Sequence, residues 1–366
     1  MTTAPVHLST RTSMRAAVHR RFGGPEVVVV EDVREPTPGP DDVLIRVHAS
    51  TVSAADHRAR TKDVPRGLAF PSALALGVLR PRHRVLGMDV AGVVEAVGAR
   101  VTRFAPGDEV IAMLGGRFGG HAEYAVVAQD GAVTLKPRNM SFDEAVTLVF
   151  GGITARGYLN QVPLGPGVRV LVNGASGAVG TAMVQLARNA GAHVTGVCSG
   201  RNRDLVTSLG ADRVIDRTTE DFTAEGVTYD VIVDCVGNAP FERVEGLIRP
   251  GGALLLVIAD LPAVLRAGRR SRTSGKLVTA SVGRYRAEDL AFLVELAEAG
   301  RFRAVCERTY DLADVTAAHA FVDQGRKRGN VVLRIAPRPA DLSRVDSTTC
   351  GGSRRVCHHM LRRASA

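Results

Sequence analysis

The amino-acid sequence predicts an α/β protein that combines a β-rich domain with a doubly wound parallel sheet. Three observations lead to this prediction. Short β-branched runs separated by Gly and Pro occupy much of residues 14–137. An apolar run, a small-residue turn, a helical pattern and a second apolar run follow one another within residues 168–200. Beyond residue 200, patterns typical of strands alternate with patterns typical of helices.

In the β-rich part, we expect strands wherever β-branched residues stand between turn signals. These strands are residues 14–19, 27–30, 43–47, 85–97, 108–114 and 122–127. The mixed segment 50–81 predicts short helical pieces, and residues 57–84 are expected to line the mouth of a cleft. A helix begins at Ser141, because Ser141 and Glu144 form a capping box.

The turn between the strand and the helix near residue 175 predicts a dinucleotide site. It reads Ala175-Ser176-Gly177-Ala178-Val179-Gly180, which is the G-x-G-x-x-G pattern with Ala in first place. Gly177 would let the backbone approach a pyrophosphate, and Gly180 would let helix and strand pack closely. The positive end of the helix dipole would face the phosphates. We therefore assign Ser176, Gly177, Ala178 and Val179 to a cofactor site; a purely structural glycine turn is the alternative.

The rest of the chain continues the alternation of strands and helices. Further strands are expected at residues 193–198, 213–215, 229–237, 252–258, 277–282 and 330–335. Further helices are expected at residues 201–209, 241–248, 287–299 and 315–323. Because the apolar segment 277–282 would be an edge strand, and exposed edges invite pairing, the sequence predicts a homodimer.

The net charge of +10 is unevenly distributed. Residues 337–366 contribute +4, Arg11 contributes +1, and a basic loop at residues 266–276 contributes +5, so the remainder is neutral. Because only Tyr285 offers an aromatic ring near the loop, a nucleic-acid partner is not expected. Residues 1–13 and 337–366 lack apolar periodicity, and we expect a disordered leader and a disordered basic tail.

Composition favours a cytoplasmic protein with no membrane partner. No apolar run reaches the roughly 18 residues that a spanning helix needs, and the N-terminal residues lack the apolar core of a signal peptide. All five cysteines follow residue 197 and form no disulfide-framework pattern.

Several stretches together resemble the medium-chain dehydrogenase/reductase superfamily, in particular its zinc-independent quinone oxidoreductase branch with the reticulon-interacting-protein-like members. They are residues 21–56, 85–110, 119–127, 168–200, 208–222, 229–237 and 328–335. The resemblance implies a GroES-like β-rich catalytic domain at residues 14–137 and 286–336. It implies a Rossmann nucleotide-binding domain at residues 138–285.

The same resemblance predicts that no zinc is bound. Ser53 and Met88 stand where zinc alcohol dehydrogenases of the superfamily carry a Cys and a His ligand, and the β-rich part has no cysteine. His57, His121 and Asp89 are possible ligands, but structural hydrogen bonds are the more common role of such residues. The tail holds four further residues of ligand type, Cys350, Cys357, His358 and His359.

Without a Lewis acid, alcohol oxidation is disfavoured, whereas an activated double bond needs only alignment and a hydrogen bond to its oxygen. The Ser53 hydroxyl is our first candidate for the catalytic donor, at a place where quinone reductases of the family usually carry Asn. His57 is the second candidate. Asp56 is expected to cap the helix that starts there.

The resemblance also implies contacts with the nicotinamide half of a cofactor. Thr154, in the turn Gly-Gly-Ile-Thr-Ala, would lie beside the nicotinamide ring, although a helix-capping hydroxyl is an equal alternative. Val236 and Gly237 would lie near its ribose.

The end of the second strand predicts a preference for NADPH over NADH. Enzymes specific for NAD carry an acid about 20 residues past the glycine turn, but this chain has none there before Asp204. Ser199 can donate to a 2′-phosphate, and Arg201, Arg203 and Arg217 can supply positive charge.

These observations favour an NADPH-dependent reductase of quinones or α,β-unsaturated carbonyls. A cofactor-binding scaffold, regulatory or RNA-binding protein is the alternative from another class, supported by the basic segments. A zinc-free, NAD(P)-dependent alcohol dehydrogenase is a third, weaker hypothesis.

Overall fold

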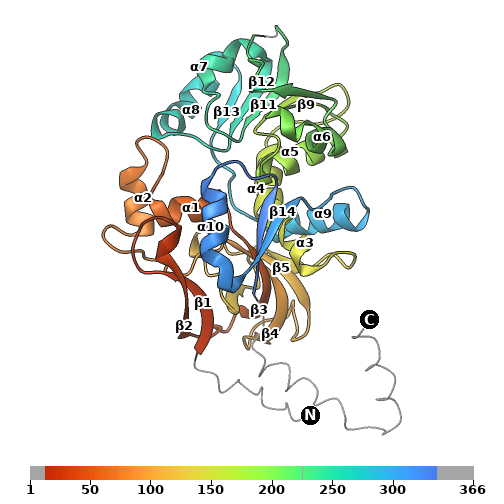
Figure 1. Cartoon of the computed structure of the whole chain (residues 1–366). Helices are drawn as coiled ribbons and strands as arrows, with labels where there is room; N and C mark the ends of the chain where they lie inside the picture. The colour runs from red at the N-terminus through yellow and green to blue at the C-terminus, as the bar shows by residue number, and fades with distance from the viewer. Residues whose placement is uncertain (1–12, 225, 336–366) are drawn as a thin grey trace. The chain divides into compact units, whose positions relative to one another are not determined.

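The computed structural model describes residues 13–224 and 226–335, which lie in one compact unit (Figure 1). The predicted leader and the predicted basic tail, with its four residues of ligand type, therefore lie outside the described residues, apart from Ser13. The strands are β1 Ser13–His19, β2 Val28–Arg34, β3 Asp42–Thr51, β4 Asp89–Val97, β5 Glu109–Met113, β6 Tyr124–Ala128, β7 Val133–Leu135, β8 Arg169–Asn173, β9 His193–Cys198, β10 Arg213–Asp216, β11 Tyr229–Asp234, β12 Ile248–Leu256, β13 Leu277–Thr279, β14 Cys306–Asp311 and β15 Asn330–Arg334. The helices are α1 Ala54–Thr61, α2 Ala69–Leu76, α3 Phe142–Val146, α4 Val149–Leu159, α5 Ala178–Asn189, α6 Arg203–Ser208, α7 Phe241–Val244, α8 Leu261–Ser274, α9 Ala287–Glu298 and α10 Val315–Asp323.

The β-rich region consists of the strands that pair with β3, directly or in series, together with β1, β2, α1, α2 and α10. Its seven-stranded sheet has the order β14-β15-β3-β4-β5-β7, with β6 also paired to β3, and β1 and β2 form a separate antiparallel pair. Because β15 pairs antiparallel to β3, with Val332 opposite Thr51, the end of the chain returns to this first sheet. The α/β fold with a GroES-like part is thereby confirmed.

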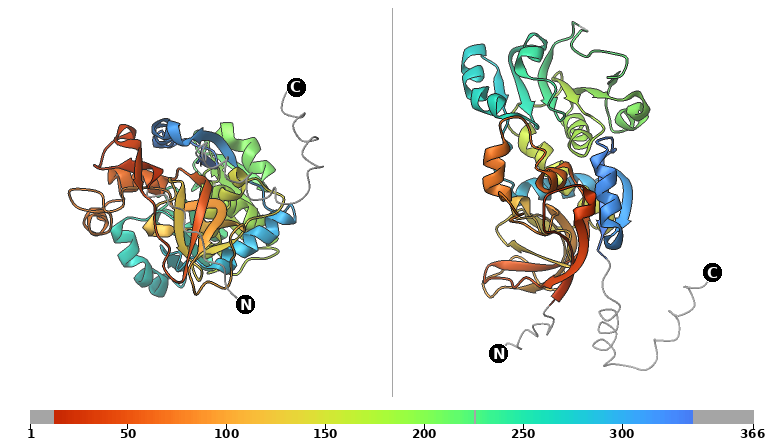
Figure 2. Two further views of the ribbon diagram at one scale, coloured as in Figure 1. Left: turned by 90° about the horizontal axis from the view of Figure 1, so that it is seen from below. Right: turned by 60° about the vertical axis from the view of Figure 1, so that its left-hand side comes forward.

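The parallel-sheet region is the second half of that fold. Its six strands have the order β10-β9-β8-β11-β12-β13, and each pair is parallel. Figure 2 shows this region from two further sides. The order reverses between β8 and β11, the point at which open α/β sheets bind ligands. The strand β13 lies at one edge, as the sequence predicted.

The apolar patterns explain why these elements pack as they do. α5 buries Ala178 and the eight consecutive positions from Gly180 to Ala187. Its buried apolar side chains join those of β8, α4 and α9 in one cluster. The capping box predicted at Ser141 is confirmed, because its side chain accepts from the backbone N–H of Glu144 and Glu144 bonds back. The helix predicted at residues 315–323 is also confirmed, as α10.

The basic loop predicted at residues 266–276 is wrong, because most of these residues form α8. The Asp260 side chain accepts from the backbone N–H of Ala263 at 2.9 Å, Pro262 lies in the first turn, and Gly275 ends the helix with a φ of 66°. Each of these residues is a known start or stop signal, so the helix could have been predicted. The short strands β7 and β14 were also missed.

Among the residues that the structure describes, no helix is both long and apolar enough to cross a membrane.

Candidate active site

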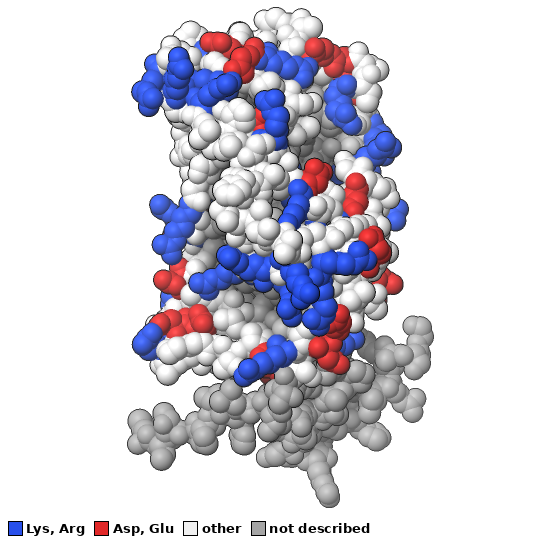
Figure 3. Space-filling view, turned by 90° about the vertical axis from the view of Figure 1, so that its left-hand side faces the viewer, with Lys and Arg blue, Asp and Glu red and all other residues white. Residues whose placement is uncertain are grey.

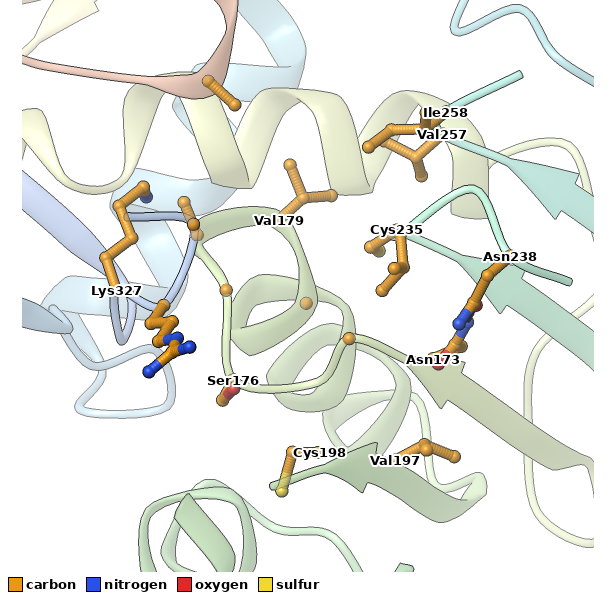
Figure 4. Close-up of a pocket in the computed structure, with 18 of the residues that line it drawn as sticks. Asn173, Ser176, Val179, Val197, Cys198, Cys235, Asn238, Val257, Ile258 and Lys327 are labelled. Atoms are coloured by element: carbon orange, nitrogen blue, oxygen red, sulfur yellow. Dashed lines mark hydrogen bonds between the residues drawn. The ribbon is translucent and has the colours of Figure 1, made fainter. Parts of the chain in front are cut away.

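A cavity of about 1700 Å³ opens at the point where the strand order of the parallel sheet reverses. Asn173 at the end of β8 and Cys235 just after β11 lie in its wall, with the glycine-rich turn between them (Figure 4). Residues of the β-rich region, including His57, Asp63 and Met88, line the same cavity. The cavity therefore joins the predicted cofactor turn to the part of the chain in which we sought catalytic groups.

The glycine-rich turn has the geometry of a phosphate cradle. Gly177 is the N-cap of α5, and a Cβ placed on it would meet only the Gly174 carbonyl oxygen, at 3.6 Å, so the space before the helix is open. A Cβ on Gly180 would lie 2.1 Å from the same oxygen, which forces glycine there. Ser176, Gly177, Ala178 and Val179 all line the cavity. An open helix N-terminus of this kind fits the pyrophosphate of a dinucleotide.

Two contacts from elsewhere in the chain fix this turn. Asn202 donates its side-chain N–H to Ser176 Oγ at 3.0 Å, and the backbone N–H of Gly329 donates to Ser176 O at 2.8 Å. Asn202 lines the cavity and its Oδ1 is buried with no partner among the described residues. Sequence reasoning missed Asn202, because nothing in its own neighbourhood shows that it faces the turn.

Lys327 is a second residue that the sequence did not reveal. It lines the cavity beside the glycine-rich turn (Figure 4), and its Nζ donates to Gly329 O at 2.7 Å. Burial lowers the pKa of Lys327 to about 8, against the smaller opposing effect of Glu307 and other acids. A partly desolvated ammonium at this position fits an anionic ligand.

Of the three arginines predicted to bind a 2′-phosphate, Arg201 and Arg217 line the cavity and Arg203 does not. Ser199, Arg201 and Arg217 line the cavity. Arg201 donates to the Arg326 carbonyl oxygen at 2.9 Å, which holds its guanidinium near that wall. Arg203 does not line the cavity: it donates to Val214 O at 2.9 Å and lies 3.9 Å from Glu220.

Of the residues assigned to the nicotinamide half of the cofactor, Thr154 and Val236 line the cavity and Gly237 does not. Thr154 lies inside α4 rather than in the turn that the sequence predicted, because the helix continues through both preceding glycines. It is 6% exposed and lines the cavity, and its Oγ1 has no partner among the described residues, so it caps no helix. Val236 lines the cavity, whereas Gly237 does not and donates its N–H to Asp234 Oδ1 at 3.0 Å. The unpartnered Thr154 hydroxyl fits a carboxamide group.

Ser53, the first candidate for the catalytic donor, is used in capping α1. Its Oγ donates to Asp56 Oδ2 at 2.6 Å and accepts from the backbone N–H groups of Ala55 and Asp56. Ser53 is 3% exposed and is not among the residues that line the cavity. Asp56 caps the helix as predicted, but from the third helical position: Ser53 is the N-cap, and Asp56 completes the capping box by accepting from the Ser53 backbone N–H.

His57, the second candidate, lies on α1 and faces the cavity. Its Nδ1 lies 2.7 Å from Asp323 Oδ1, and its Nε2 lies 3.6 Å from Asp63 Oδ2. Because a carboxylate can only accept, Nδ1 carries the hydrogen of the first contact. Asp323 is in turn fixed by both oxygens to Arg60, at 2.6 Å each, and the Arg60 side chain is fully buried.

The residues present do not fit a catalytic zinc site. No group of three or more His, Cys, Asp or Glu side chains within residues 13–224 and 226–335 is arranged to hold a metal ion. His121 Nε2 lies 3.0 Å from the Thr51 carbonyl oxygen, and Asp89 accepts from the Thr51 backbone N–H at 2.7 Å. Burial raises the pKa of Asp89 to about 7, partly offset by its hydrogen bonds with Thr51.

The segment expected at the cleft mouth reaches the cavity only at its start. Of residues 57–84, only His57, Arg58 and Asp63 line the cavity. The remainder, which includes α2, does not line the cavity.

Comparison with known proteins agrees with this geometry. Residues 39–137 match the family described as "Alcohol dehydrogenase GroES-like domain", and residues 209–333 match the family described as "Zinc-binding dehydrogenase". The chain is 32% identical to "Quinone-oxidoreductase QR1, chloroplastic" of Triphysaria versicolor over 338 residues, covering 87% of this chain and 98% of the relative. It is 32% identical to mouse "NAD(P)H oxidoreductase RTN4IP1, mitochondrial", covering 81% and 82%.

Solved structures show the same fold. A quinone oxidoreductase from Coxiella burnetii superposes with a TM-score of 0.77 at 26% identity, covering 88% of this chain and all of the other. A cobalt- and zinc-bound alcohol dehydrogenase from Pyrobaculum aerophilum superposes with a TM-score of 0.72 at 28% identity over the same shares.

Proposed function

The chain belongs to the medium-chain dehydrogenase/reductase superfamily as an NAD(P)H-dependent oxidoreductase, and on this premise we propose that it is an NADPH-dependent reductase of quinones or α,β-unsaturated carbonyls that works without a metal ion. One observation carries the proposal. The cavity that is lined by the glycine-rich turn is also lined by His57, a histidine held by a carboxylate. We therefore infer that His57 is the group that assists the substrate.

When bound, the nicotinamide supplies the hydride. The protein must then orient the substrate and stabilise the negative charge that develops on its oxygen. We assign this task to His57 rather than Ser53, because the Ser53 hydroxyl hydrogen is engaged by Asp56. With Nδ1–H directed at Asp323, Nε2 is left on the side of Asp63, 3.6 Å from its Oδ2, and both residues line the cavity. A hydrogen on Nε2 can pass from there to the substrate oxygen.

The buried ion pair behind His57 gives this arrangement its rigidity. Arg60 balances the charge of Asp323, so the carboxylate holds the imidazole in one orientation without itself needing a proton. Asp323 is therefore a positioning residue.

Relatives support both substrate classes. Two of them are named quinone oxidoreductases, and a third, 31% identical over 346 residues and covering 90% of this chain, is named "2-methylene-furan-3-one reductase" from Solanum lycopersicum. Both classes offer a double bond conjugated to a carbonyl, which accepts hydride at carbon and charge at oxygen.

Three cations at the turn favour NADPH. Arg201 and Arg217 line the cavity beside Ser199, where no acid occupies the end of β9, and Lys327 adds charge at the pyrophosphate. We expect Arg201 and Arg217 to pair with a 2′-phosphate.

The finer sequence predictions on assembly and location also remain proposals. We propose that β13 pairs with its counterpart in a homodimer and that the protein is cytoplasmic. Light scattering that gives a monomer mass at micromolar concentration would contradict the first.

The deciding experiment measures NADPH and NADH oxidation against a panel of benzoquinones, naphthoquinones and enones, with primary alcohols and NADP⁺ as the reverse control. We expect turnover with NADPH and either a quinone or an enone, no effect of a chelator, and no stoichiometric zinc by elemental analysis. Turnover limited to alcohols, or lost to the chelator with about one zinc per chain, would refute the proposal.

A further inference from the structure

Six large apolar side chains are exposed on two neighbouring segments, around α2 and on α8. Among the described residues they make up six of the eleven large hydrophobic side chains that are exposed. Phe70 is 75% exposed, Leu79 is 88% exposed and Leu265 is 72% exposed. The six, which we call the α2–α8 surface, are Phe70, Leu74, Val78, Leu79, Val264 and Leu265. So large an apolar exposure in one place indicates a binding surface.

Hydrogen bonds and an ion pair hold the two segments side by side. The backbone N–H of Leu261 donates to the Arg66 carbonyl oxygen at 3.0 Å, and the Arg66 side chain lies 3.2 Å from Asp260. Lys62 donates from Nζ to the Val78 carbonyl oxygen, which ties the chain after α2 to the end of α1. In Figures 1 and 2, α2 and α8 lie on the same side of the molecule.

The same two segments carry a net positive charge, although Asp63 directly precedes the first and Asp260, which pairs with Arg66, directly precedes the second. Residues 64–84 contain four arginines, and residues 261–280 contain four arginines and one lysine, with no Asp or Glu in either. Figure 3 shows this side of the molecule with an uncharged region between an upper and a lower band in which Lys and Arg outnumber Asp and Glu. On α8, Leu265, Arg269 and Arg272 are exposed at helical spacing and so share a face.

We propose that the α2–α8 surface binds the headgroup region of an anionic lipid bilayer. Exposed aliphatic and aromatic side chains bordered by an excess of arginines match the chemistry of such an interface. A second copy of the chain fits less well, because a two-fold contact would place like charges face to face. The sequence prediction that excluded a membrane partner considered only spanning helices, and this surface needs none.

The inference is independent of the proposed function, because it concerns binding to a lipid surface and no step of the reaction. The test measures sedimentation of the full-length chain with vesicles of phosphatidylcholine, with and without phosphatidylglycerol. We expect binding only to the phosphatidylglycerol vesicles, weakening as salt is added.

Variants locate the surface. The double variant Arg269→Gln with Arg272→Gln should lower the partition coefficient about fivefold per arginine. The double variant Phe70→Ser with Leu265→Ser should lower it by roughly tenfold or more. The matched controls are Leu135→Ser, another exposed leucine, and Arg138→Gln with Arg301→Gln, beside α9; these should bind as the wild type does.

Three results would overturn the proposal. They are absence of binding to phosphatidylglycerol vesicles at low salt, equal loss of binding in the control variants, and conversion of a dimer to a monomer by Phe70→Ser with Leu265→Ser. The last would show that a second copy covers the surface. Melting temperatures equal to that of the wild type exclude misfolding as the cause of any loss.

Discussion

The two ends of the cavity differ in how their functional groups are held. At the glycine-rich turn, the groups come from consecutive residues, and their geometry follows from a strand, a tight turn and a helix. At the other end, His57 is oriented by Asp323, which is 266 positions away, and Asp323 by Arg60. A site made by local backbone can be recognised in a sequence, whereas a site made by distant side chains is assembled only by the fold.

The largest expected effect tests the distant site. His57→Leu removes the proposed donor and should lower kcat by about 10²–10³-fold. The dissociation constant for NADPH should change little, because His57 does not belong to the glycine-rich turn. Steady-state kinetics with the best quinone or enone, together with fluorescence titration of NADPH, separate the two quantities.

The matched control is Ser53→Ala, at the residue that the sequence favoured. Loss of this N-cap should cost about 1 kcal/mol of stability and reduce kcat far less than His57→Leu does. If Ser53→Ala instead lost most of its kcat while His57→Leu kept its own, the Ser53 hydroxyl would turn to the substrate and the sequence assignment would hold.

This pair of residues shows where sequence reasoning succeeded and where it could not. Residue type made Ser53 a reasonable donor, but only the structure shows that its hydrogen is directed at Asp56. Likewise, nothing near Lys327 in the sequence shows that it returns to the glycine-rich turn through the contact between Gly329 and Ser176.

The elements themselves were largely predictable, because apolar periodicity is a local property. The parallel, doubly wound sheet followed from the alternation of strands and helices, and α10 was predicted with the bounds it has. The main error, α8, had a different cause. The segment was interpreted from its charge alone, although Asp260, Pro262 and Gly275 are start and stop signals that can be recognised locally in the sequence.

The second prediction tests the local site through two arginines close in sequence. Arg201→Ala should weaken NADPH binding by about 1.5–3 kcal/mol, which is about 10- to 150-fold, and leave NADH binding nearly unchanged. Arg203→Ala should have a clearly smaller effect, because its guanidinium donates to Val214 O outside the cavity. Titration of both variants with both cofactors measures this. Equal losses in the two variants, or equal NADH and NADPH affinities in the wild type, would contradict the assignment.

The third prediction concerns Lys327, which a distant segment brings to the local site. Lys327→Gln should weaken NADPH binding by about tenfold, the lower end for a charged hydrogen bond. Since burial lowers the pKa of Lys327 to about 8, the wild type should lose NADPH affinity as the pH rises through about 8. Dissociation constants between pH 7 and 9 measure this, and the variant should lack that step. A step of the same size in Lys327→Gln would assign the titration to another group.

The smallest expected effect is on stability. Lowering the pH should reduce the free energy of unfolding through histidines that all lie in the β-rich region. Burial lowers the pKa of three histidines, and all three lie in the β-rich region: His19 on β1, His48 on β3 and His319 on α10. His319 is fully buried, and neither ring nitrogen has a partner among the described residues. Below about pH 6.5 these imidazole rings are protonated in the unfolded chain but stay neutral in the folded protein. The free energy of unfolding therefore falls with decreasing pH.

His319→Leu isolates this contribution. Asp89 opposes it, because its raised pKa of about 7 makes stability fall as the pH rises toward 7 in the wild type and the variant alike. The free energy of unfolding between pH 6.5 and 5 should therefore fall less steeply in the variant, by up to about 1.4 kcal/mol per pH unit, the limit for one proton. Urea unfolding at several pH values measures the slopes. Equal slopes would mean that folding does not lower the pKa of His319. The acid sensitivity of the β-rich region would then rest on His19 and His48.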